Sequence, residues 1–236
     1  MAKPQGHSLG GYLSINYCIK YPSHVDRLIL VSPVGVPNNP YETKNDVEVD
    51  PLIIDPPDII VQSEFSQPHD LPSKSAVQAP RPLPRWVTIL WEANFSPFMF
   101  ARIPVVGPKF ASGWTSRRFG DLPSVRERQI LSEYAYQIFR QKGSGEFALA
   151  YLLAPGAYAR RPLMNRIKLL QNDSVLKTVT WIYGSYDWMD VDAGREASEK
   201  LGDIESDVHV VEKAGHNVHL DNPEGFNRII RKILRS

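Results

Sequence analysis

The chain lacks several features that would place it in a well-marked class. It has one cysteine, Cys18, so no disulfide can form within it, and that count is compatible with a reducing compartment without establishing one. It has no run of 18 or more apolar residues, so we expect no transmembrane helix. The formal net charge of +1 gives no sign of a nucleic-acid-binding surface. No apolar stretch marks a secretory signal at its start.

What is present is an ordinary globular composition, with 42% hydrophobic and 22% charged residues in a chain of 236. That length suits one large domain, or one domain with an insertion. The 20 prolines cluster, and residues 38–85 are rich in them and lack a clear period. We predict that this stretch is flexible and partly disordered. The alternative is an ordered, irregular loop packed on a neighbouring element.

Short, continuous apolar runs predict strands buried on both faces of a parallel sheet. The clearest is Arg27–Val31, and Val179–Tyr183 and Val208–Val211 follow later. A last helix is expected to begin at Asn222, with Pro223 in its first turn. Further helices are expected over residues 12–21, 124–141, 145–159 and 193–201. Strands that alternate with helices imply an α/β fold built on a parallel sheet.

The pattern divides the chain into three parts. Residues 1–37 hold the first helix and the first core strand, and residues 171–236 hold the C-terminal α/β core. Between them, residues 38–170 read as a largely helical cap insertion, of which 38–85 is the proline-rich part.

The stretch Gly6-His7-Ser8-Leu9-Gly10 matches the pattern G-x-S-x-G. In enzymes that carry it, the serine sits on a sharp turn between a buried strand and a helix. Gly6 and Gly10 are expected to let that turn form without side-chain clashes, and the Leu9 N–H to stabilise an oxyanion. The alternative is an ordinary serine at the start of a helix, because the motif alone is a weak signal.

A serine nucleophile needs a histidine to accept its proton and a carboxylate to orient that histidine. Asp187 follows the end of one predicted strand, and His216 follows the next. The chain order Ser8, Asp187, His216 is the order found in α/β-hydrolases. Asp190 and Asp192 are alternative acids, or caps of the helix that follows them.

The other histidines carry weaker signals. His219 lies three residues after His216, but no cysteine or glutamate joins them at metal-ligand spacing, so we expect no metal and no cofactor. His209 alternates within a strand and is expected to be structural. His7 occupies a variable position of the motif, and no chemistry is assigned to it.

Several stretches together resemble one family. They are "GHSLGGYLSINYCIKYPSHVDRLILVSPVGVP", "ANFSPFMFARIPVVGPKFASGWTSRRF", "GSGEFALAYLLAPGAYARRPL", "TVTWIYGSYDWMD" and "AGHNVHLDNPEGFNRII". The chain resembles the lipid-acting branch of the α/β-hydrolase fold, which includes the lipid-droplet lipase coactivator, the N-acyl phospholipid lysophospholipase and the yeast cardiolipin-specific phospholipase. The run Asp-Trp-Met-Asp and the tryptophan-rich cap resemble the fungal members most closely.

The resemblance implies a serine hydrolase that acts on acyl-ester bonds of lipids, as a phospholipase, a lysophospholipase or a lysophospholipid acyltransferase. The family's possible acyltransferase motif, a histidine followed five positions later by an aspartate, falls on His216 and Asp221. The alternative for Asp221 is that it helps to cap the last helix beside Asn222. Ser8 favours an enzyme, because the coactivator in this family lacks a serine at this point.

The cap is rich in aromatic side chains with a few arginines among them. They are Trp86, Trp91, Phe95, Phe98, Phe100, Phe110, Trp114, Arg102, Arg117 and Arg118. These residues either hold acyl chains, anionic head groups or a membrane interface, or form the core of the cap itself. Family resemblance suggests a peripheral location on mitochondrial membranes or lipid droplets.

The motif stands very close to the start of the chain. An α/β-hydrolase has several strands before the nucleophile, including the strand that carries it, and "MAKPQ" is too short and contains Pro4. The chain is therefore interpreted as the C-terminal part of a family member, with Arg27–Val31 left as an exposed edge strand. Loss of one oxyanion donor typically costs about 10²–10³ in turnover, so this chain is predicted to be weak or inactive alone.

Two other functions stay open at this point. One is a non-catalytic module of the same family that binds membranes or partners through the cap. The other is a small-molecule hydrolase such as a peptidase acting on N-terminal proline, which would need a more polar pocket than this cap offers.

Overall fold

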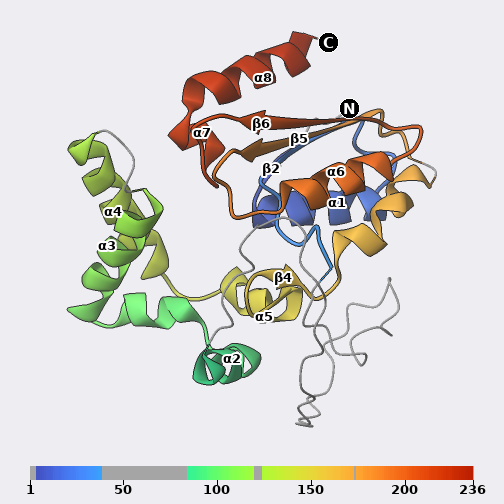
Figure 1. The fold of residues 1–236 in the computed structure, drawn as a ribbon. Helices are drawn as coiled ribbons and strands as arrows, with labels where there is room; N and C mark the ends of the chain where they lie inside the picture. Colours follow the sequence, from blue (N-terminus) through green and yellow to red (C-terminus); the bar gives the residue numbers. More distant parts are fainter. Residues whose placement is uncertain (1–3, 39–83, 120–123, 173, 236) are drawn as a thin grey trace, which may run out of the picture.

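The computed structural model describes residues 4–38, 84–119, 124–172 and 174–235 (Figure 1). The prediction of a flexible segment over residues 38–85 lies almost wholly outside the described residues. Within the described ranges the structure is α/β, as predicted from the alternation of strands and helices.

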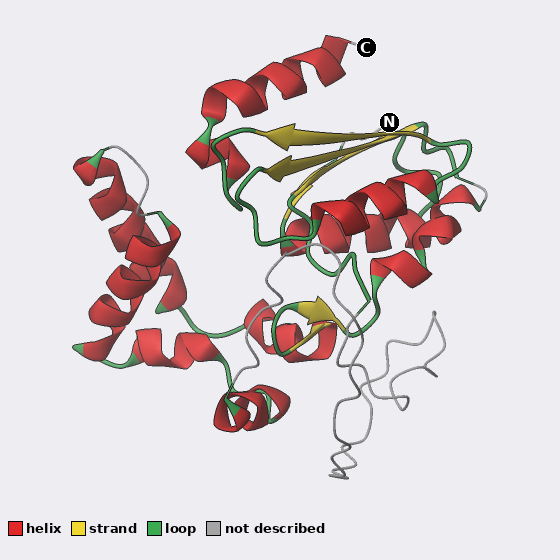
Figure 2. Cartoon of the chain, in the orientation of Figure 1, coloured by secondary structure: helices red, strands yellow, loops and turns green. Residues whose placement is uncertain are grey.

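A four-stranded parallel sheet forms the centre of the structure, in the order β1-β2-β5-β6 (Figures 1 and 2). Its strands are β1 (Gln5–His7), β2 (Arg27–Val31), β5 (Thr178–Gly184) and β6 (Glu205–Val211). Because all four run in the same direction, the loops that follow their carboxyl ends lie at one end of the sheet.

The strands are buried because their side chains alternate between two apolar layers. Leu28 and Leu30 of β2 belong to the larger core cluster on one face of the sheet. Ile29 and Val31 belong to the smaller cluster on the other face. This is why β2 reads as a continuous apolar run in the sequence rather than as an alternating one.

Helices cover both faces of the sheet, as Figure 1 shows. The first face is covered by α1 (Leu9–Lys20) and α6 (Val191–Glu199), which contribute to the larger cluster. The second is covered by α8 (Pro223–Arg235), which follows the short helix α7 (Val218–Asp221). Along α8, Phe226, Ile229, Ile230 and Ile233 turn toward the sheet, the stripe expected from helical spacing.

The described residues between β2 and β5 are mostly helical and lie to one side of the sheet (Figure 2). Their elements are α2 (Arg85–Glu92), η2 (Pro97–Arg102), α3 (Val106–Arg118), α4 (Val125–Phe139), η3 (Gly145–Ala148), α5 (Leu149–Leu152), β3 (Leu153–Ala154), β4 (Tyr158–Ala159), η4 (Leu163–Asn165) and η5 (Ile167–Gln171). None of the helices in the described segments combines the length and apolar character needed to span a bilayer.

The strand before Ser8 is present, which corrects the expectation that the first residues cannot form one. Gln5–His7 pairs in parallel with β2, with Gln5 opposite Ile29. Pro4 has no N–H to donate, but its carbonyl accepts a hydrogen bond from the Ile29 N–H at 3.1 Å. A proline directly before the strand is therefore tolerated, because only its carbonyl acceptor is used there.

The same pairing corrects the prediction that Arg27–Val31 is an exposed edge. Within the described residues β2 lies between β1 and β5, and Leu28, Ile29, Leu30 and Val31 are all buried. The outer strands of the described sheet are β1 and β6.

Candidate active site

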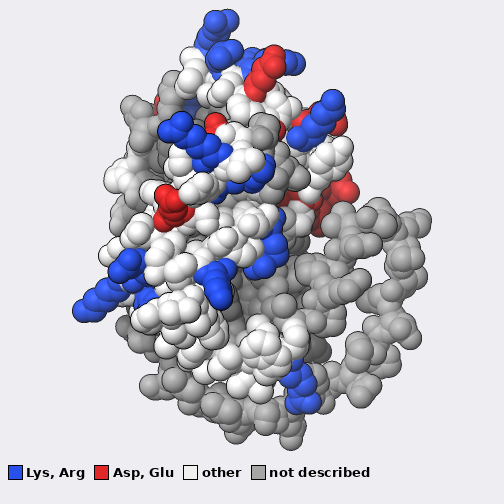
Figure 3. Space-filling view, turned by 90° about the vertical axis from the view of Figure 1, so that its left-hand side faces the viewer, with Lys and Arg blue, Asp and Glu red and all other residues white. Residues whose placement is uncertain are grey.

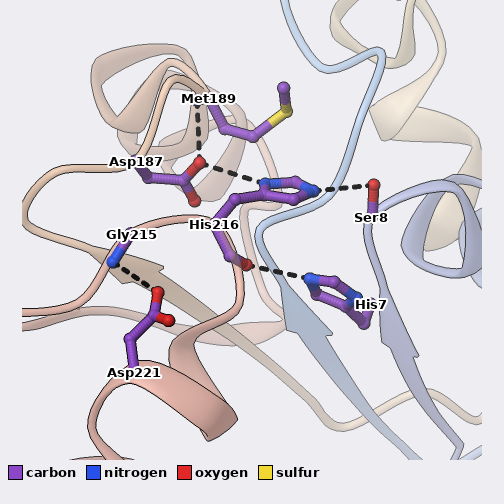
Figure 4. Close-up of polar contacts among 7 residues, drawn as sticks. All are labelled: His7, Ser8, Asp187, Met189, Gly215, His216 and Asp221. Atoms are coloured by element: carbon purple, nitrogen blue, oxygen red, sulfur yellow. Dashed lines mark hydrogen bonds and ion pairs between the residues drawn. The ribbon is translucent and has the colours of Figure 1, made fainter. Parts of the chain in front are cut away.

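Three side chains meet at the carboxyl end of the sheet, and each comes from a different connection (Figure 4). Ser8 stands between β1 and α1, Asp187 in the loop after β5, and His216 in the loop after β6. His216 Nε2 lies 2.9 Å from Ser8 Oγ, and His216 Nδ1 lies 3.1 Å from Asp187 Oδ1. The structure thus brings together the three residues selected from the sequence.

The backbone of Ser8 holds its hydroxyl out of the turn. Its φ of 54° and ψ of −119° are rare for a residue with a side chain, and such a conformation costs about 1–3 kcal/mol. The Ser8 N–H donates to the Val31 carbonyl at 2.9 Å, which ties the turn to β2. Leu9 is the first residue of α1, and its N–H donates no hydrogen bond to any residue that the structure describes. This N–H is therefore available to an anion.

The glycines around Ser8 do not all serve the turn, which corrects the sequence argument in part. A Cβ on Gly6 would lie 2.5 Å from the Gly10 carbonyl oxygen and 2.7 Å from Gly11 Cα. A Cβ on Gly11 would lie 2.8 Å from Pro33 Cβ. A Cβ on Gly10 would meet no described atom within 4 Å, so the close approach requires Gly6 and Gly11 rather than Gly10.

This difference gives a matched pair of variants. Gly6→Ala is expected to lower the free energy of unfolding by about 1–3 kcal/mol, because backbone must move to admit the methyl group. Gly10→Ala is expected to leave it unchanged or raise it by up to about 1 kcal/mol, because alanine favours the helix. Urea titration of both variants measures the difference, and equal destabilisation by the two would contradict this assignment.

Asp187 is buried with its side chain 0% exposed, and it is held by two donors. Its Oδ1 accepts from His216 Nδ1 and from the Met189 N–H at 3.0 Å. Burial acts to raise the pKa of this carboxyl, but the His216 ring, the Ser32 hydroxyl and the Met189 N–H together outweigh it and hold the pKa below its ordinary value. The Ser32 hydroxyl lies near this carboxylate, although neither Ser32 Oγ nor Asp187 Oδ2 forms a hydrogen bond with any residue that the structure describes.

The loops that carry Asp187 and His216 are joined to each other through backbone. The Ser185 N–H donates to the Val211 carbonyl at 3.0 Å, and the Tyr186 N–H donates to the Ala214 carbonyl at 2.9 Å. A Cβ on Gly184 would collide with the carbonyl oxygens of Ala214 and Gly215. Glycine at the end of β5 therefore allows the two loops to pack closely.

This arrangement can move a proton away from a hydroxyl. With its proton on Nδ1 donated to Asp187, His216 presents the lone pair of Nε2 to the Ser8 hydroxyl. The geometry, the elbow and the order of the three residues agree with one family, and residues 6–229 match the alpha/beta hydrolase family. The chain belongs to this family.

Similar proteins identify the branch of the alpha/beta hydrolase family. A protein of Arabidopsis thaliana named 1-acylglycerol-3-phosphate O-acyltransferase is 32% identical over 98% of this chain and 48% of its own length. A (lyso)-N-acylphosphatidylethanolamine lipase of Mus musculus is 31% identical over 98% of this chain and 58% of its own length. These relatives confirm the resemblance to the lipid-acting branch, and this chain spans about half their length.

A solved structure confirms the fold independently. MenH from S. aureus superposes on 98% of this chain and 66% of its own chain, with a TM-score of 0.56 and 16% sequence identity. At 16% sequence identity the match shows the alpha/beta hydrolase fold and does not show a shared activity.

The structure also places the alternative acids and histidines. Asp190 caps α6, because its Oδ1 accepts from the Ala193 N–H at 2.9 Å, and Asp192 pairs with Arg195 on the surface of the same helix. His209 lies on β6 opposite Ile182. Across the segments that the structure describes, no group of three or more histidine, cysteine, aspartate or glutamate residues is placed to hold a metal ion.

Asp221 has a use that sequence reasoning missed. Its Oδ2 accepts a hydrogen bond at 2.8 Å from the N–H of Gly215, the residue that directly precedes His216 (Figure 4). The cap of α8 is instead Asn222, whose Oδ1 accepts from the Gly225 N–H at 2.9 Å. The expectation that Asp221 helps to cap the last helix is therefore replaced by a contact that holds the histidine loop.

Two aromatic rings at His216 were also missed. Trp188 lies with its ring centroid 5.1 Å from that of His216, and His7 lies 4.9 Å from it. In the sequence Trp188 stands out only as part of the run Asp187–Asp190, which does not indicate its contact with His216. His7 had no sequence signal, because its contact with His216 joins positions 209 residues apart.

The aromatic side chains of the cap differ in whether they are packed together or exposed. Trp114 packs edge-on against Phe119 and Phe139, and Phe98 also contacts Phe139, so these rings form a core of the cap itself. Trp86 is 64% exposed. Other apolar residues of the cap are exposed as well: Ile89, Met99, Phe100, Ile103, Val105 and Val106.

Arg102 is committed within the cap. Its guanidinium forms two hydrogen bonds with the Glu146 carboxylate, and its Nε donates to the Gln141 carbonyl at 2.7 Å. These bonds use three of the five N–H groups of Arg102 and pair its charge with a carboxylate, which argues against its inclusion among the arginines expected to bind head groups.

Proposed function

We propose that this chain carries the catalytic site of a serine hydrolase that acts on acyl-ester bonds of lipids. The observation that supports this most directly is the pair of hydrogen bonds that connects Ser8, His216 and Asp187. In this proposal the three residues are the nucleophile, the base and the orienting acid of a triad.

The proposed reaction has two halves. Ser8 Oγ attacks the acyl carbonyl while His216 Nε2 accepts the hydroxyl proton, and Asp187 stabilises the imidazolium that forms. His216 then gives that proton to the leaving alkoxide, which departs as the alcohol and leaves the acyl group on Ser8. Water, deprotonated by His216, attacks the acyl-serine ester and releases the fatty acid.

The negative charge that develops on the acyl oxygen is proposed to be held by the Leu9 N–H. That group stands at the start of α1, where the helix dipole also favours an anion. It is the one such donor that we assign within the described residues.

The proposed substrates are acylated phospholipids or lysophospholipids. The named activities of the relatives in Arabidopsis thaliana and Mus musculus concern 1-acylglycerol-3-phosphate and N-acylphosphatidylethanolamine. The exposed apolar side chains of the cap, such as Trp86 and Val105 at 64% and 76% exposure, suit contact with a lipid surface. On the face shown in Figure 3, Lys and Arg side chains are more abundant than Asp and Glu side chains. This excess of positive charge favours contact with an anionic lipid surface.

Acyl transfer is the second candidate function, because it requires the same acyl-serine intermediate with a lysophospholipid hydroxyl in place of water. The Arabidopsis relative bears the name of such an enzyme. We prefer hydrolysis, because the Asp221 oxygen that faces the histidine loop is occupied by the Gly215 N–H. The possible motif of His216 and Asp221 thus has a structural explanation without transfer.

Ser8→Ala is expected to abolish the release of fatty acid from a lysophospholipid presented in mixed vesicles, because no nucleophile remains. Ser14→Ala is the matched control, since the hydrogen bond that Ser14 Oγ makes among the described residues is donated to the Gly10 carbonyl within α1. Fatty acid and any diacyl product are both measured, which separates hydrolysis from transfer. Equal turnover by Ser8→Ala and the parent chain would overturn the proposal, and vesicle binding by an inactive but folded chain would favour the non-catalytic alternative.

A further inference from the structure

His7 is the last residue of β1 and directly precedes Ser8, so its backbone is part of the elbow. Its Nε2 lies 2.9 Å from the carbonyl oxygen of His216 (Figure 4). A carbonyl oxygen can only accept, so the proton of the His7 ring must be on Nε2. This hydrogen bond reaches the main chain of the residue whose side chain faces Ser8.

The ring of His7 also fills the space beside the histidine loop. Its centroid lies 4.9 Å from the ring of His216 and 5.2 Å from the ring of His219, which it meets edge-on. A ring that is packed on two sides has little freedom to turn. Packing therefore helps the hydrogen bond to keep the His7 Nε2–H directed at the His216 carbonyl.

Burial keeps His7 neutral. It lowers the pKa of the ring to about 4, with the hydrogen bond to His216 acting in the opposite direction and the charges of His216, His219 and Arg118 acting with burial. Near neutral pH the ring therefore carries one proton. That proton is committed to the His216 carbonyl.

The contact matters because few others join these two parts of the chain. Among the described residues, two hydrogen bonds connect residues 4–20 with residues 212–222, and both end on His216. One is the bond between the side chains of Ser8 and His216, and the other is the bond from His7 to the main chain. The Gly215 N–H bond to Asp221 lies within the loop itself and fixes its shape, not its place relative to the elbow.

We propose that His7 is a positioning residue, which fixes the backbone of His216 relative to the elbow and so sets the distance between His216 Nε2 and Ser8 Oγ. Its consequence for turnover rests on the proposed function, but its structural role does not. A displacement of about 1 Å at a reacting pair can cost about 10²-fold in rate, so the expected effect of losing the donor is large.

The test compares His7→Phe, which keeps a ring but removes the donor, with His7→Gln, which keeps a donor at similar reach. His24→Phe is the matched control, because His24 pairs with the Tyr17 hydroxyl away from the site. Amide hydrogen exchange of residues 214–221 is expected to rise in His7→Phe and to stay at the parent level in His7→Gln and His24→Phe. Labelling of Ser8 by a fluorophosphonate is expected to slow about 10–10²-fold in His7→Phe alone.

The outcomes separate this proposal from the proposed function. If the parent chain is not labelled, the hydrolase proposal fails and the exchange data still decide the role of His7. If exchange and labelling in His7→Phe match His24→Phe, the role of His7 is wrong. Nitrogen-15 NMR of the parent chain gives a check that needs no variant: the Nε2–H tautomer of His7 is expected, and the Nδ1–H tautomer would overturn the proposal.

Discussion

Replacing His216 with glutamine is expected to slow the reaction of Ser8 with a fluorophosphonate by about 10²–10⁴-fold, because the hydroxyl then lacks a base. Glutamine keeps a polar group of similar length, so the change removes proton transfer more than it removes packing. His216 is 6% exposed, and a smaller residue there would leave a cavity beside Trp188. The second-order rate constant of labelling measures the effect.

His24→Gln is the control for this variant, because the same substitution is made at an exposed histidine outside the site. Its labelling rate is expected to equal that of the parent chain. If His216→Gln also labels at the parental rate while both variants are folded, Ser8 is not activated by His216, and the proposed mechanism is wrong.

Asp187→Asn is expected to slow the same reaction by up to about 10⁴-fold, as seen when the acid of another Ser-His-Asp triad is replaced by its amide. An asparagine presents an N–H as readily as a carbonyl to His216 Nδ1. The imidazole proton can then move to Nε2, and a protonated Nε2 can no longer accept the proton of the Ser8 hydroxyl. Asp190→Asn is the matched control, because asparagine caps a helix about as well as aspartate does.

The pH dependence of stability gives this variant a second readout. The pKa of Asp187 is lower in the folded chain than its ordinary value of about 3.9, so the carboxylate favours folding above that value. The parent chain is therefore expected to lose this contribution as the pH falls through the lowered folded-state pKa. Asp187→Asn should not show that loss, and thermal unfolding at pH 7 and below pH 4 measures the difference. An identical pH dependence in the two proteins would contradict the assigned environment of Asp187.

The parts of the fold that could be read from the sequence are those with a local cause. Arg27–Val31 is a strand with the predicted bounds, because its side chains are buried on both faces and leave an uninterrupted apolar run. Asp187 and His216 could be placed because each follows a strand, and parallel strands bring such loops to one end of a sheet. The domain boundaries at residues 37 and 170 stay predictions.

What could not be read depends on contacts between distant residues. Gln5–His7 is too short to show a period, and only its pairing with β2 makes it a strand. Gly6 and Gly10 look equivalent in the motif, yet only the backbone packed against Gly6 distinguishes them. Asp221 and His7 both bond to main-chain atoms of the loop that carries His216. Nearly every residue has these main-chain atoms, so the residue types in the sequence do not predict such bonds.

The most direct test of the account is to treat the purified chain with a fluorophosphonate and locate the adduct by mass spectrometry of its peptides. One adduct is expected, on Ser8, and it is expected to be lost in Ser8→Ala and kept in Ser14→Ala. A folded chain that forms no adduct, or one whose adduct lies elsewhere and persists in Ser8→Ala, would contradict the claim that Ser8, His216 and Asp187 form a working nucleophilic site.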